Sequence, residues 1–316
     1  MIRAAIDQDI TPTDRLLERL PTDWDATVGL GSTEAEARAD LADADVAFVT
    51  SRVPLTTAVV AAASDLDVIG KLGTGLDSVE VAAARDRGVE VTYTPGMNAL
   101  SVAEHTLALT LATARRLTEA RHLIETDRWR DDVHLGTRLS GSTVGIVGFG
   151  NVGKRVGSLL GGFDVDLLVH DPYVPEIDGE LVGAEHVPLE TVLAESDVVC
   201  VTAELTDETR GLLGEEELAA MSESAILVNT ARGPIVQRDP LLDALQTGAI
   251  AGAGLDVHHD EPLGSDSPFL TLDNAVLTPH TASMTLESRQ ETIARLAENV
   301  RTLVAGETLP ERYLAP

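Results

Sequence analysis

Short apolar runs alternate with helical stretches along most of the chain. In the first hundred residues, the predicted elements are strands at 44–50, 68–72 and 89–93 and helices at 56–63 and 79–87. A second series of compact, almost wholly apolar runs lies at residues 143–147, 165–169, 198–202, 225–229, 252–257 and 276–278. Such runs are typical of parallel strands that helices cover on both faces of the sheet. The pattern predicts an α/β protein built from alternating strands and helices.

Two longer helical stretches flank the second series. Thr94-Pro95-Gly96 breaks the first series, and residues 101–117 then carry apolar side chains throughout. This predicts a long, largely buried helix that can join two domains. The last helical stretch covers residues 286–305, and a short tail follows it.

The composition and the absence of long apolar stretches indicate how large a core the chain can bury and in which compartment it is expected. A chain of 316 residues with 44% hydrophobic content can bury a sizeable core, and this length favours two domains over one. The N-terminus lacks the charged-then-apolar pattern of a cleaved signal, and no apolar stretch approaches the roughly 20 residues of a spanning helix. We therefore expect a cytoplasmic protein that does not bind membranes.

The surface is unusually acidic. The formal net charge is -29, and Lys71 and Lys154 are the only lysines among 23 basic residues. A nucleic-acid partner is disfavoured by this charge. Because the acidic residues are scattered along the chain, the surface resembles that of proteins from salt-accumulating cytoplasms, where molar salt shortens the screening length to roughly 3 Å. An ordinary acidic protein is the alternative.

A dinucleotide-binding fingerprint stands in the second series. Gly148-Phe149-Gly150-Asn151-Val152-Gly153 follows the strand at 143–147 and opens a helix, and Asp171 ends the next strand 23 residues after Gly148. Between a strand and a helix, the three glycines have separate roles. Gly148 allows a tight turn, Gly150 allows the pyrophosphate to approach the backbone, and Gly153 allows the helix to pack closely on the strand. The helix N-terminus then stabilises the phosphates.

Asp171 bears on the choice of cofactor. A carboxylate at this position accepts hydrogen bonds from the ribose hydroxyls and repels a 2′-phosphate, which predicts NAD over NADP. High salt weakens this repulsion. The alternative is a plain strand, turn and helix in which Asp171 is a loop acid.

Two other features are assigned no chemistry. Cys200 lies inside an apolar run, and we expect a structural core role for it. His258, His259 and Asp260 are adjacent, but neighbouring residues of an extended segment point to opposite sides and no metal-ligand spacing accompanies them. We therefore predict no metal site and interpret both histidines as loop residues.

Four further segments, together with the fingerprint, carry a resemblance to a known family. They are Gly73-Thr74-Gly75-Leu76-Asp77, Ser101-Val102-Ala103-Glu104-His105, Val228-Asn229-Thr230-Ala231-Arg232-Gly233, and the stretch from Leu255-Asp256-Val257 through Glu261-Pro262 to Pro279-His280. In this order they resemble the D-isomer-specific 2-hydroxyacid dehydrogenases over nearly the whole chain. The phosphoglycerate dehydrogenase branch is the nearest, and because the chain ends at Pro316 we expect it to be without the regulatory domain of that branch.

The resemblance implies an architecture of two Rossmann-like doubly wound domains, with the cofactor domain inserted into a flavodoxin-like substrate domain. The substrate-binding domain would comprise residues 1–98 and 285–316, and the NAD-binding domain residues 99–284. The active site would lie in the cleft. The family also implies a homodimer that forms through the helix from Ser101 to Leu117.

The resemblance implies the catalytic residues as well. Arg232 matches the arginine that binds the substrate carboxylate and polarises the carbonyl, His280 matches the acid-base residue, and Glu261 matches its carboxylate partner. The turn at Gly73, Thr74 and Gly75 resembles the carboxylate-binding loop, while Thr230 and Asp256 would line the nicotinamide pocket. For a phosphorylated substrate, the candidate cations are Arg52 and Lys71, with Arg130 or Arg138 as further choices.

Some positions depart from the family pattern. Thr202 and Glu204 replace a frequent histidine and proline after the strand at 198–202, and Gln237-Arg238 stands where an acidic pair is common. These changes put contacts with the edge of the cofactor in doubt.

The function implied is an NAD-dependent dehydrogenase of a small 2-hydroxy acid, with 3-phosphoglycerate as the leading substrate. A glyoxylate or hydroxypyruvate reductase is a close alternative, and a formate- or phosphite-type dehydrogenase is a more distant one because Glu261 stands where the formate type has an amide. A non-catalytic, NAD-sensing binding protein on the same fold is the alternative from another class.

Overall fold

The chain folds into two compact units. The computed structural model describes all residues from 1 to 316, and its units are Met1–Asn98 with Met284–Pro316, and Ala99–Ser283. The second unit is therefore inserted in the sequence between the two parts of the first. Each unit has its own parallel sheet and its own buried core.

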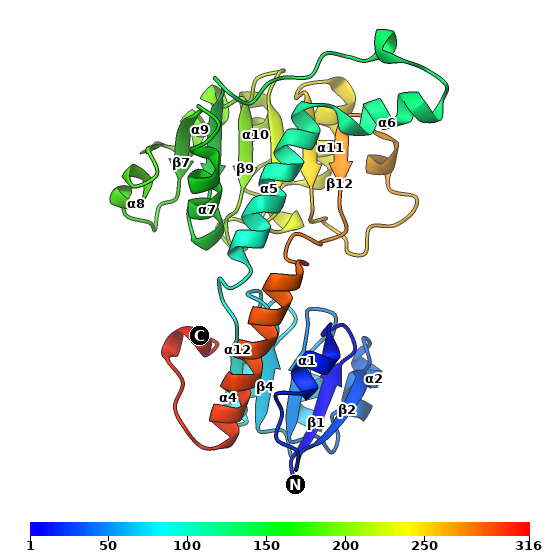
Figure 1. Cartoon of the computed structure of the whole chain (residues 1–316), viewed down its shortest axis with the longest axis vertical. Coiled ribbons are helices and arrows are strands. Elements are labelled where there is room, and N and C mark those ends of the chain that lie inside the picture. Colours follow the sequence, from blue (N-terminus) through cyan, green and yellow to red (C-terminus); the bar gives the residue numbers. More distant parts are fainter. The chain divides into compact units, whose positions relative to one another are not determined.

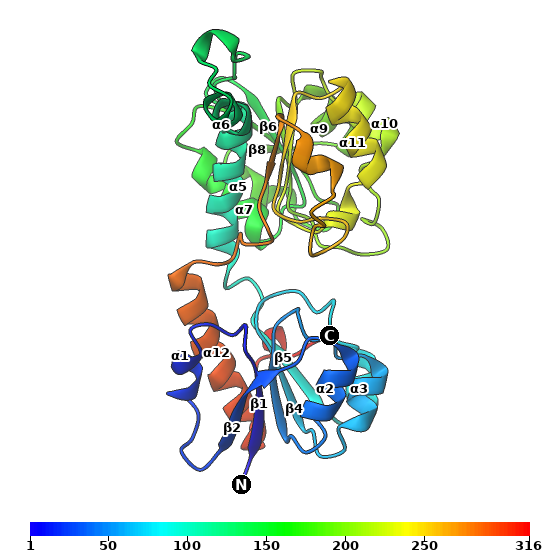
Figure 2. The same ribbon diagram turned by 90° about the vertical axis from the view of Figure 1, so that its right-hand side faces the viewer.

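The first unit is a five-stranded sheet in the order β2-β1-β3-β4-β5, and every neighbouring pair is parallel. The strands are β1 (Arg3–Asp7), β2 (Asp25–Leu30), β3 (Val46–Val49), β4 (Val68–Lys71) and β5 (Glu90–Tyr93). On one face lie α1 (Thr13–Leu17) and α12 (Leu286–Val304); the other face carries α2 (Glu34–Asp40), α3 (Thr57–Ala62) and α4 (Val81–Asp86) (Figure 2). This strand order is that of flavodoxin-like proteins.

The C-terminal helix belongs to the first unit because its apolar face packs directly on the sheet (Figure 1). A Cβ added at Gly70 of β4 would lie 2.6 Å from Val300 Cγ2, so only a glycine lets α12 approach this closely. Ile293, Leu296 and Val300 of the helix are fully buried. The helix predicted at residues 286–305 is confirmed to within one residue.

The second unit is a seven-stranded parallel sheet in the order β12-β11-β10-β9-β6-β7-β8. Its strands are β6 (Thr143–Val147), β7 (Asp166–His170), β8 (Ala184–His186), β9 (Val198–Val201), β10 (Ile226–Asn229), β11 (Gly252–Leu255) and β12 (Ala275–Leu277). The chain starts at the centre with β6 and winds outwards in both directions, which is the doubly wound order of dinucleotide-binding domains. The predicted α/β fold class is confirmed for both units.

Helices cover both faces of this sheet. On one face lie α5 (Ala99–Ala114) and α7 (Asn151–Leu160); on the other lie α9 (Leu189–Glu195), α10 (Glu215–Ala220) and α11 (Arg238–Thr247) (Figure 2). The remaining helices of the unit are α6 (Leu117–Glu125) and α8 (Glu176–Glu180), and short 3-10 turns cover Arg130–Asp132, Gly233–Ile235, Pro268–Thr271 and, in the first unit, Glu311–Tyr313.

The helix predicted over residues 101–117 has different bounds. It begins at Ala99 and ends at Ala114, and Arg116 adopts a left-handed conformation, with φ of 53°, before α6 begins at Leu117. The left-handed residue stops the helical hydrogen-bond ladder. The prediction was therefore wrong at the C-terminal end, where apolar residues continue across a helix break.

The apolar face of α5 is already covered by its own sheet. A Cβ at Gly254 of β11 would lie 3.0 Å from Leu109 Cβ, and Leu109 itself is 3% exposed. Leu100 near the start of α5 is 51% exposed, and α6 and the segment that follows it carry four more exposed apolar side chains, namely Leu117, Ile124, Trp129 and Leu135. These last four residues are called the apolar patch on α6 and the following segment.

The fold contains no candidate membrane-spanning helix and one buried cysteine. No helix in the structure combines the length and the apolar character needed to cross a bilayer. Cys200 is buried in β9, and burial raises the pKa of its thiol to about 12, so the thiolate does not form at neutral pH. The core role predicted for this residue fits its position.

Candidate active site

The glycine turn lies at the carboxyl end of β6, at the centre of the second sheet. Gly148 has φ of +90°, and a Cβ at this position would lie 2.3 Å from Ala203 Cα. A Cβ at Gly153 would lie 2.4 Å from the Gly148 carbonyl oxygen. A side chain at Gly148 would collide with the segment after β9, and one at Gly153 would push α7 away from the turn, so the turn and the helix start depend on both glycines.

The turn leaves room for a ligand on its outer side. A Cβ at Gly150 would meet nothing within 4 Å, and α7 begins at the next residue, Asn151, with Val152 following. The backbone amides of a helix's first turn have no partner within the helix and favour anions. The residues present therefore fit the pyrophosphate of a dinucleotide, which is the role predicted for Gly150, Asn151 and Val152.

Asp171 closes the turn from the neighbouring strand. It follows β7, and its Oδ2 accepts a hydrogen bond from the Phe149 amide at 2.7 Å while its Oδ1 accepts one from the Tyr173 amide at 3.0 Å. The side chain is half-buried. Each carboxylate oxygen accepts more than one hydrogen bond, so Asp171 can hold the loop and still receive ribose hydroxyls.

Thr202 has a structural role that the sequence did not reveal. Its hydroxyl donates to the Gly148 carbonyl at 2.5 Å, and its amide donates to the Val147 carbonyl at 2.8 Å. Thr202 therefore holds the glycine turn against β9. Thr202 departs from the family pattern, and this departure put contacts with the cofactor in doubt. In the structure, the Thr202 side chain stabilises the glycine turn.

The loop after β10 carries Arg232. Asn229, the last residue of the strand, accepts from the Ala231 amide and donates to the Arg232 carbonyl, both at 3.0 Å. The Arg232 guanidinium is half-buried and donates through Nη1 to the Ala231 carbonyl at 2.7 Å. Asn229 was not among the predicted site residues, although a polar side chain at the end of an apolar strand is a usable signal.

This loop packs directly on the loop after β11. A Cβ at Gly233 would lie 1.9 Å from the carbonyl oxygen of His258, so no other residue fits without displacing one of the two loops. The contact brings the backbone of Arg232 next to the segment that leads to Glu261. Residues that are far apart in the sequence thus share one edge of the second unit.

His280 and Glu261 form the ion pair that the resemblance predicts. His280 Nδ1 lies 2.8 Å from Glu261 Oε2, and the side chains are 42% and 37% exposed. Burial alone would raise the pKa of Glu261, but hydrogen bonds from the His280 ring and from the His258 amide outweigh it and leave the pKa below its ordinary value. Glu261 is therefore ionised at neutral pH and accepts the Nδ1 proton, which leaves Nε2 of His280 for a substrate.

His258 and His259 differ in their surroundings. His258 is buried, its ring Nε2 lies 3.0 Å from the Thr278 carbonyl, and its amide donates to Glu261 Oε1 at 3.0 Å. His259 is exposed beside Asp260. The interpretation of His258 as an ordinary loop residue was incomplete, because its backbone fixes the carboxylate of Glu261. The structure contains no group of three or more His, Cys, Asp or Glu side chains arranged to hold a metal ion.

Asp256 lies deeper than its predicted role implies. Its side chain is fully buried, Oδ1 accepts from the Thr278 hydroxyl at 2.6 Å and from the Thr281 amide at 2.8 Å, and Oδ2 accepts from the Ala282 amide at 2.9 Å. Burial alone would raise the pKa of this carboxyl, and these bonds with that from His105 lower it to about 2. Asp256 thus organises the turn that bears His280, and contact with nicotinamide stays a prediction.

Thr230 is also buried, and its hydroxyl lies 2.7 Å from that of Thr106 on α5. Its predicted position beside the nicotinamide is not tested by this contact. The hydrogen bond does tie the loop of Arg232 to the helix that crosses behind it.

The glycine-rich loop of the first unit follows β4. Gly73 has φ of +99° and its amide donates to the Thr94 hydroxyl at 2.9 Å. The Thr74 hydroxyl lies 3.2 Å from Asn98 Oδ1 and accepts from the Gly96 amide at 3.1 Å. The loop that includes Gly75 is thus held in a defined conformation, and carboxylate binding by its amides stays a prediction.

The cations predicted for a phosphorylated substrate are engaged elsewhere. Arg52 donates through Nε to the buried carboxylate of Asp7 at 3.0 Å and lies 3.3 Å from Asp9. Lys71 is 2% exposed, and its Nζ donates to the Leu72 carbonyl at 2.9 Å. Arg52 is therefore paired with carboxylates of the first unit, and Lys71 is buried in that unit.

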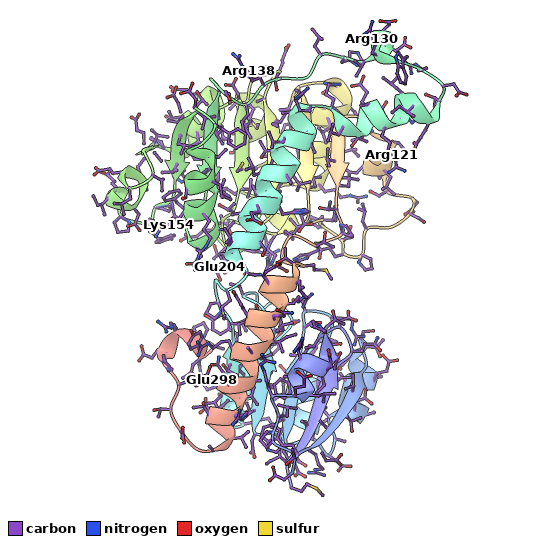
Figure 3. All side chains as sticks on the ribbon, viewed as in Figure 1. Arg121, Arg130, Arg138, Lys154, Glu204 and Glu298 are labelled. Atoms are coloured by element: carbon purple, nitrogen blue, oxygen red, sulfur yellow. The ribbon has the colours of Figure 1, made fainter.

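Arg130 and Arg138 lie at the end of the second unit opposite to the carboxyl edge of its sheet. Figure 3 places them opposite the end that carries Glu204, which follows β9 on the carboxyl side of the sheet. Because His280 and Arg232 also follow the carboxyl ends of strands, the two arginines are remote from them. The expectation that Arg130 or Arg138 meets the substrate is not supported within this unit.

Comparison with known proteins agrees with this geometry. Residues 107–282 match the family model described as the NAD binding domain of D-isomer specific 2-hydroxyacid dehydrogenases. A crystal structure of a protein from Thermus thermophilus superposes with a TM-score of 0.88 and 34% identity over 100% of both chains.

Two kinds of curated relative resemble the chain. A D-3-phosphoglycerate dehydrogenase from Archaeoglobus fulgidus is 36% identical over 90% of this chain, which spans 54% of that relative's length. A glyoxylate reductase from Korarchaeum cryptofilum is 40% identical over 85% of this chain and 81% of its own length. The chain therefore belongs to the D-isomer specific 2-hydroxyacid dehydrogenase family.

Proposed function

We propose that this protein is an NAD-dependent dehydrogenase that interconverts a small D-2-hydroxy acid and its 2-oxo acid. The observation that carries the proposal is the hydrogen bond between His280 and an ionised Glu261, on the carboxyl side of the same sheet in which β6 ends in the glycine turn. Arg232 follows another strand of that edge. A sensor of nucleotide that performs no reaction has no need for this acid-base pair.

Each residue has a distinct task in the reaction. The Arg232 guanidinium binds the substrate carboxylate through two parallel N–H donors and draws electron density from the adjacent carbonyl. His280 donates the proton of Nε2 to the carbonyl oxygen during reduction and removes it during oxidation, while ionised Glu261 stabilises the imidazolium and fixes the ring. Bound NADH supplies the hydride.

We propose that Asp171 makes the protein prefer NADH to NADPH. The Asp171 side chain is already held by two backbone amides, so its carboxylate cannot swing away from an incoming 2′-phosphate without losing both hydrogen bonds. A neutral ribose hydroxyl, in contrast, donates to it.

For the substrate, we propose an unphosphorylated 2-oxo acid such as glyoxylate or hydroxypyruvate. A phosphoryl dianion needs available cations, yet Arg52 is paired with Asp7 and Asp9 and Lys71 is buried. The relative named glyoxylate reductase shares 40% identity and matches this chain over 81% of its length.

A second candidate is 3-phosphohydroxypyruvate, the oxidised form of 3-phosphoglycerate. It is favoured by the 36% identity to a D-3-phosphoglycerate dehydrogenase over 90% of this chain. Since this chain spans 54% of that relative, the likeness does not extend to the whole protein.

NADH oxidation by the purified protein in molar KCl tests these proposals. We expect turnover with glyoxylate and hydroxypyruvate at a kcat/KM at least ~10-fold above that for 3-phosphohydroxypyruvate, with pyruvate as a further comparison. The reverse order would replace the proposed substrate with the phosphorylated one. Binding of NADH without turnover on any of the four acids would favour the non-catalytic sensor instead.

The acidic surface is the reason for the high KCl concentration in this assay. With a net charge of -29, self-repulsion at low ionic strength opposes the folded state, and molar salt screens it. We propose adaptation to a salt-accumulating cytoplasm, in which case the protein loses activity as KCl is diluted to ~0.1 M and regains it when salt is restored.

We propose that the protein is a homodimer and that its apolar patch on α6 and the following segment forms the interface. Leu117, Ile124, Trp129 and Leu135 are between 55% and 93% exposed, which leaves large apolar side chains in water in the monomer. The sequence predicted a dimer contact through the helix from Ser101 to Leu117, whereas this proposal places the contact on α6 and the segment that follows it. Light scattering tests it: we expect Ile124→Glu to yield a monomer, and a monomeric wild type would refute the proposal.

A further inference from the structure

Another histidine, His105, lies behind the turn that bears His280. His105 is on α5, in the stretch that also supplies Val102 and Thr106 to the core, and its side chain is 23% exposed. Its Nε2 lies 3.0 Å from the Thr278 hydroxyl and 3.4 Å from Asp256 Oδ1. These partners follow two different strands, β11 and β12, so one ring contacts both.

The direction of the hydrogen bonds follows from the groups around the ring. The Thr278 hydroxyl has a single proton and donates it to Asp256 Oδ1 at 2.6 Å. Asp256 is ionised because its pKa is about 2, so it has no proton to offer. Towards His105, both groups are therefore acceptors, and His105 Nε2 must carry the proton.

Asp256 in turn holds three consecutive amides of the catalytic turn. Its backbone carbonyl accepts from the His280 amide at 2.7 Å, and its side chain accepts from the amides of Thr281 and Ala282 at 2.8 and 2.9 Å. His280 itself has φ of +54°, a conformation that non-glycine residues adopt only when the surroundings impose it. The orientation of the His280 ring thus depends on where Asp256 lies.

We propose that His105 is a positioning residue for the acid-base group, acting through a single Nε2–H donor, shared between Thr278 and Asp256, that fixes the turn of residues 280–282. The inference rests on the proposed function only for its catalytic consequence. The helix that carries His105 is tied to the Arg232 loop, because the Thr106 hydroxyl donates to the Val102 carbonyl at 2.8 Å and is bonded to Thr230 in that loop. One helix turn therefore supports both catalytic loops.

Two substitutions separate the hydrogen bond from the space the ring fills. His105→Phe keeps a ring of similar size and removes the donor, whereas the amide of His105→Gln places an N–H group close to the original Nε2. Thr110→Val is the matched control, because it removes from the same helix a buried hydroxyl that donates to the Thr106 carbonyl at 2.9 Å and does not touch the His280 turn.

We expect His105→Phe to lower kcat by about 10-fold, the effect of losing one hydrogen bond to a charged group, while the affinity for NADH and the KM for the 2-oxo acid change less than about twofold. His105→Gln should recover kcat to within about threefold of wild type, and Thr110→Val should leave it unchanged. A mere loss of stability would not be rescued in this way. Wild-type kcat in a folded His105→Phe protein, or equal impairment in the Phe and Gln variants, overturns the proposal.

NMR spectroscopy tests the positioning role of His105 independently of turnover. In protein labelled with ¹⁵N-histidine, we expect the His105 ring to be protonated at Nε2, and the His280 ring signals, assigned with His280→Ala, to shift in His105→Phe and to return in His105→Gln. A His105 ring protonated only at Nδ1, or unshifted His280 signals in the Phe variant, overturns the proposal. If the wild type reduces no 2-oxo acid, the proposed function fails, and these spectra still test the positioning role.

Discussion

Replacing Glu261 with glutamine tests the acid-base pair with little change of shape. In the wild type, the carboxylate Oε2 lies 2.8 Å from His280 Nδ1 and Oε1 accepts from the His258 amide. In Glu261→Gln, the new side-chain amide can keep the second contact through its oxygen. The variant loses the negative charge beside the ring, so the imidazolium that donates the proton becomes harder to form.

The size of the effect follows from the exposure of the pair. A hydrogen bond to a charged group is worth roughly 1.5–3 kcal/mol, and two charges 4 Å apart attract by about 1 kcal/mol in water and about 4 kcal/mol near a protein surface. Because the side chains are 42% and 37% exposed, solvent screens the pair and the lower part of the range applies. We therefore expect a loss of about 1.5–2.5 kcal/mol, or roughly 10- to 70-fold in kcat for reduction.

The assay is the steady-state rate of NADH oxidation as a function of pH in molar KCl. Since the pKa of Glu261 is lowered in the folded protein, its carboxylate stays ionised through the ordinary carboxylate range and is neutralised only as pH falls through that lowered pKa. Reduction by Glu261→Gln should reach half its maximum at a lower pH than reduction by wild type. An unchanged pH profile with an unchanged kcat would refute the role assigned to Glu261.

Other predictions concern single contacts. His280→Ala should lower kcat at least ~100-fold with little change in NADH affinity by fluorescence titration, and near-normal turnover would remove it from the mechanism. Asp171→Asn should lower the NADH-to-NADPH ratio of kcat/KM by at least ~10-fold, whereas an unchanged ratio would exclude its charge as the determinant. In Gly153→Ala, the Cβ lies 2.4 Å from the Gly148 carbonyl, so we expect at least ~10-fold weaker NADH binding; wild-type affinity would contradict the packing argument. The pKa of buried Glu119 is lowered to about 2, since hydrogen bonds from Arg116 and His134 outweigh burial, so Glu119→Gln should lose roughly 2–3 kcal/mol of stability above pH 4.5, a difference that vanishes as pH falls towards 2 in denaturant unfolding curves.

Strands that form apolar runs were predicted from the sequence, including the edge strands β5 and β12, whereas β1, β2 and β8 were not predicted. The run at residues 143–147 matches β6 residue for residue, because every position of this central strand after Thr143 is apolar or small. Strand β2 has only one buried residue in six, and β8 has three residues at the far edge of its sheet. A strand with one neighbour and an exposed face need not be apolar, so hydrophobic pattern alone does not reveal it.

The sequence by itself determined the cofactor turn, because each of its glycines answers a local demand of the backbone: a positive φ at Gly148 and close packing at Gly153. It also indicated Arg232, Glu261 and His280, through motifs that resemble a family. The acidic surface is a property of composition and needed no fold to be seen.

Only the tertiary structure decided which polar groups act together. His105, Asp256 and Thr278 are more than twenty residues apart in every pairing, and they meet because parallel strands end at one edge and α5 crosses behind them. The tertiary structure also decided the surroundings of the cations predicted for a phosphorylated substrate. No pattern along the chain shows that Arg52 donates a hydrogen bond to Asp7 or that Lys71 is buried. Hydrogen-bond partners are set by distance in space, and hydrophobic periodicity carries no information about distance between side chains that the chain separates.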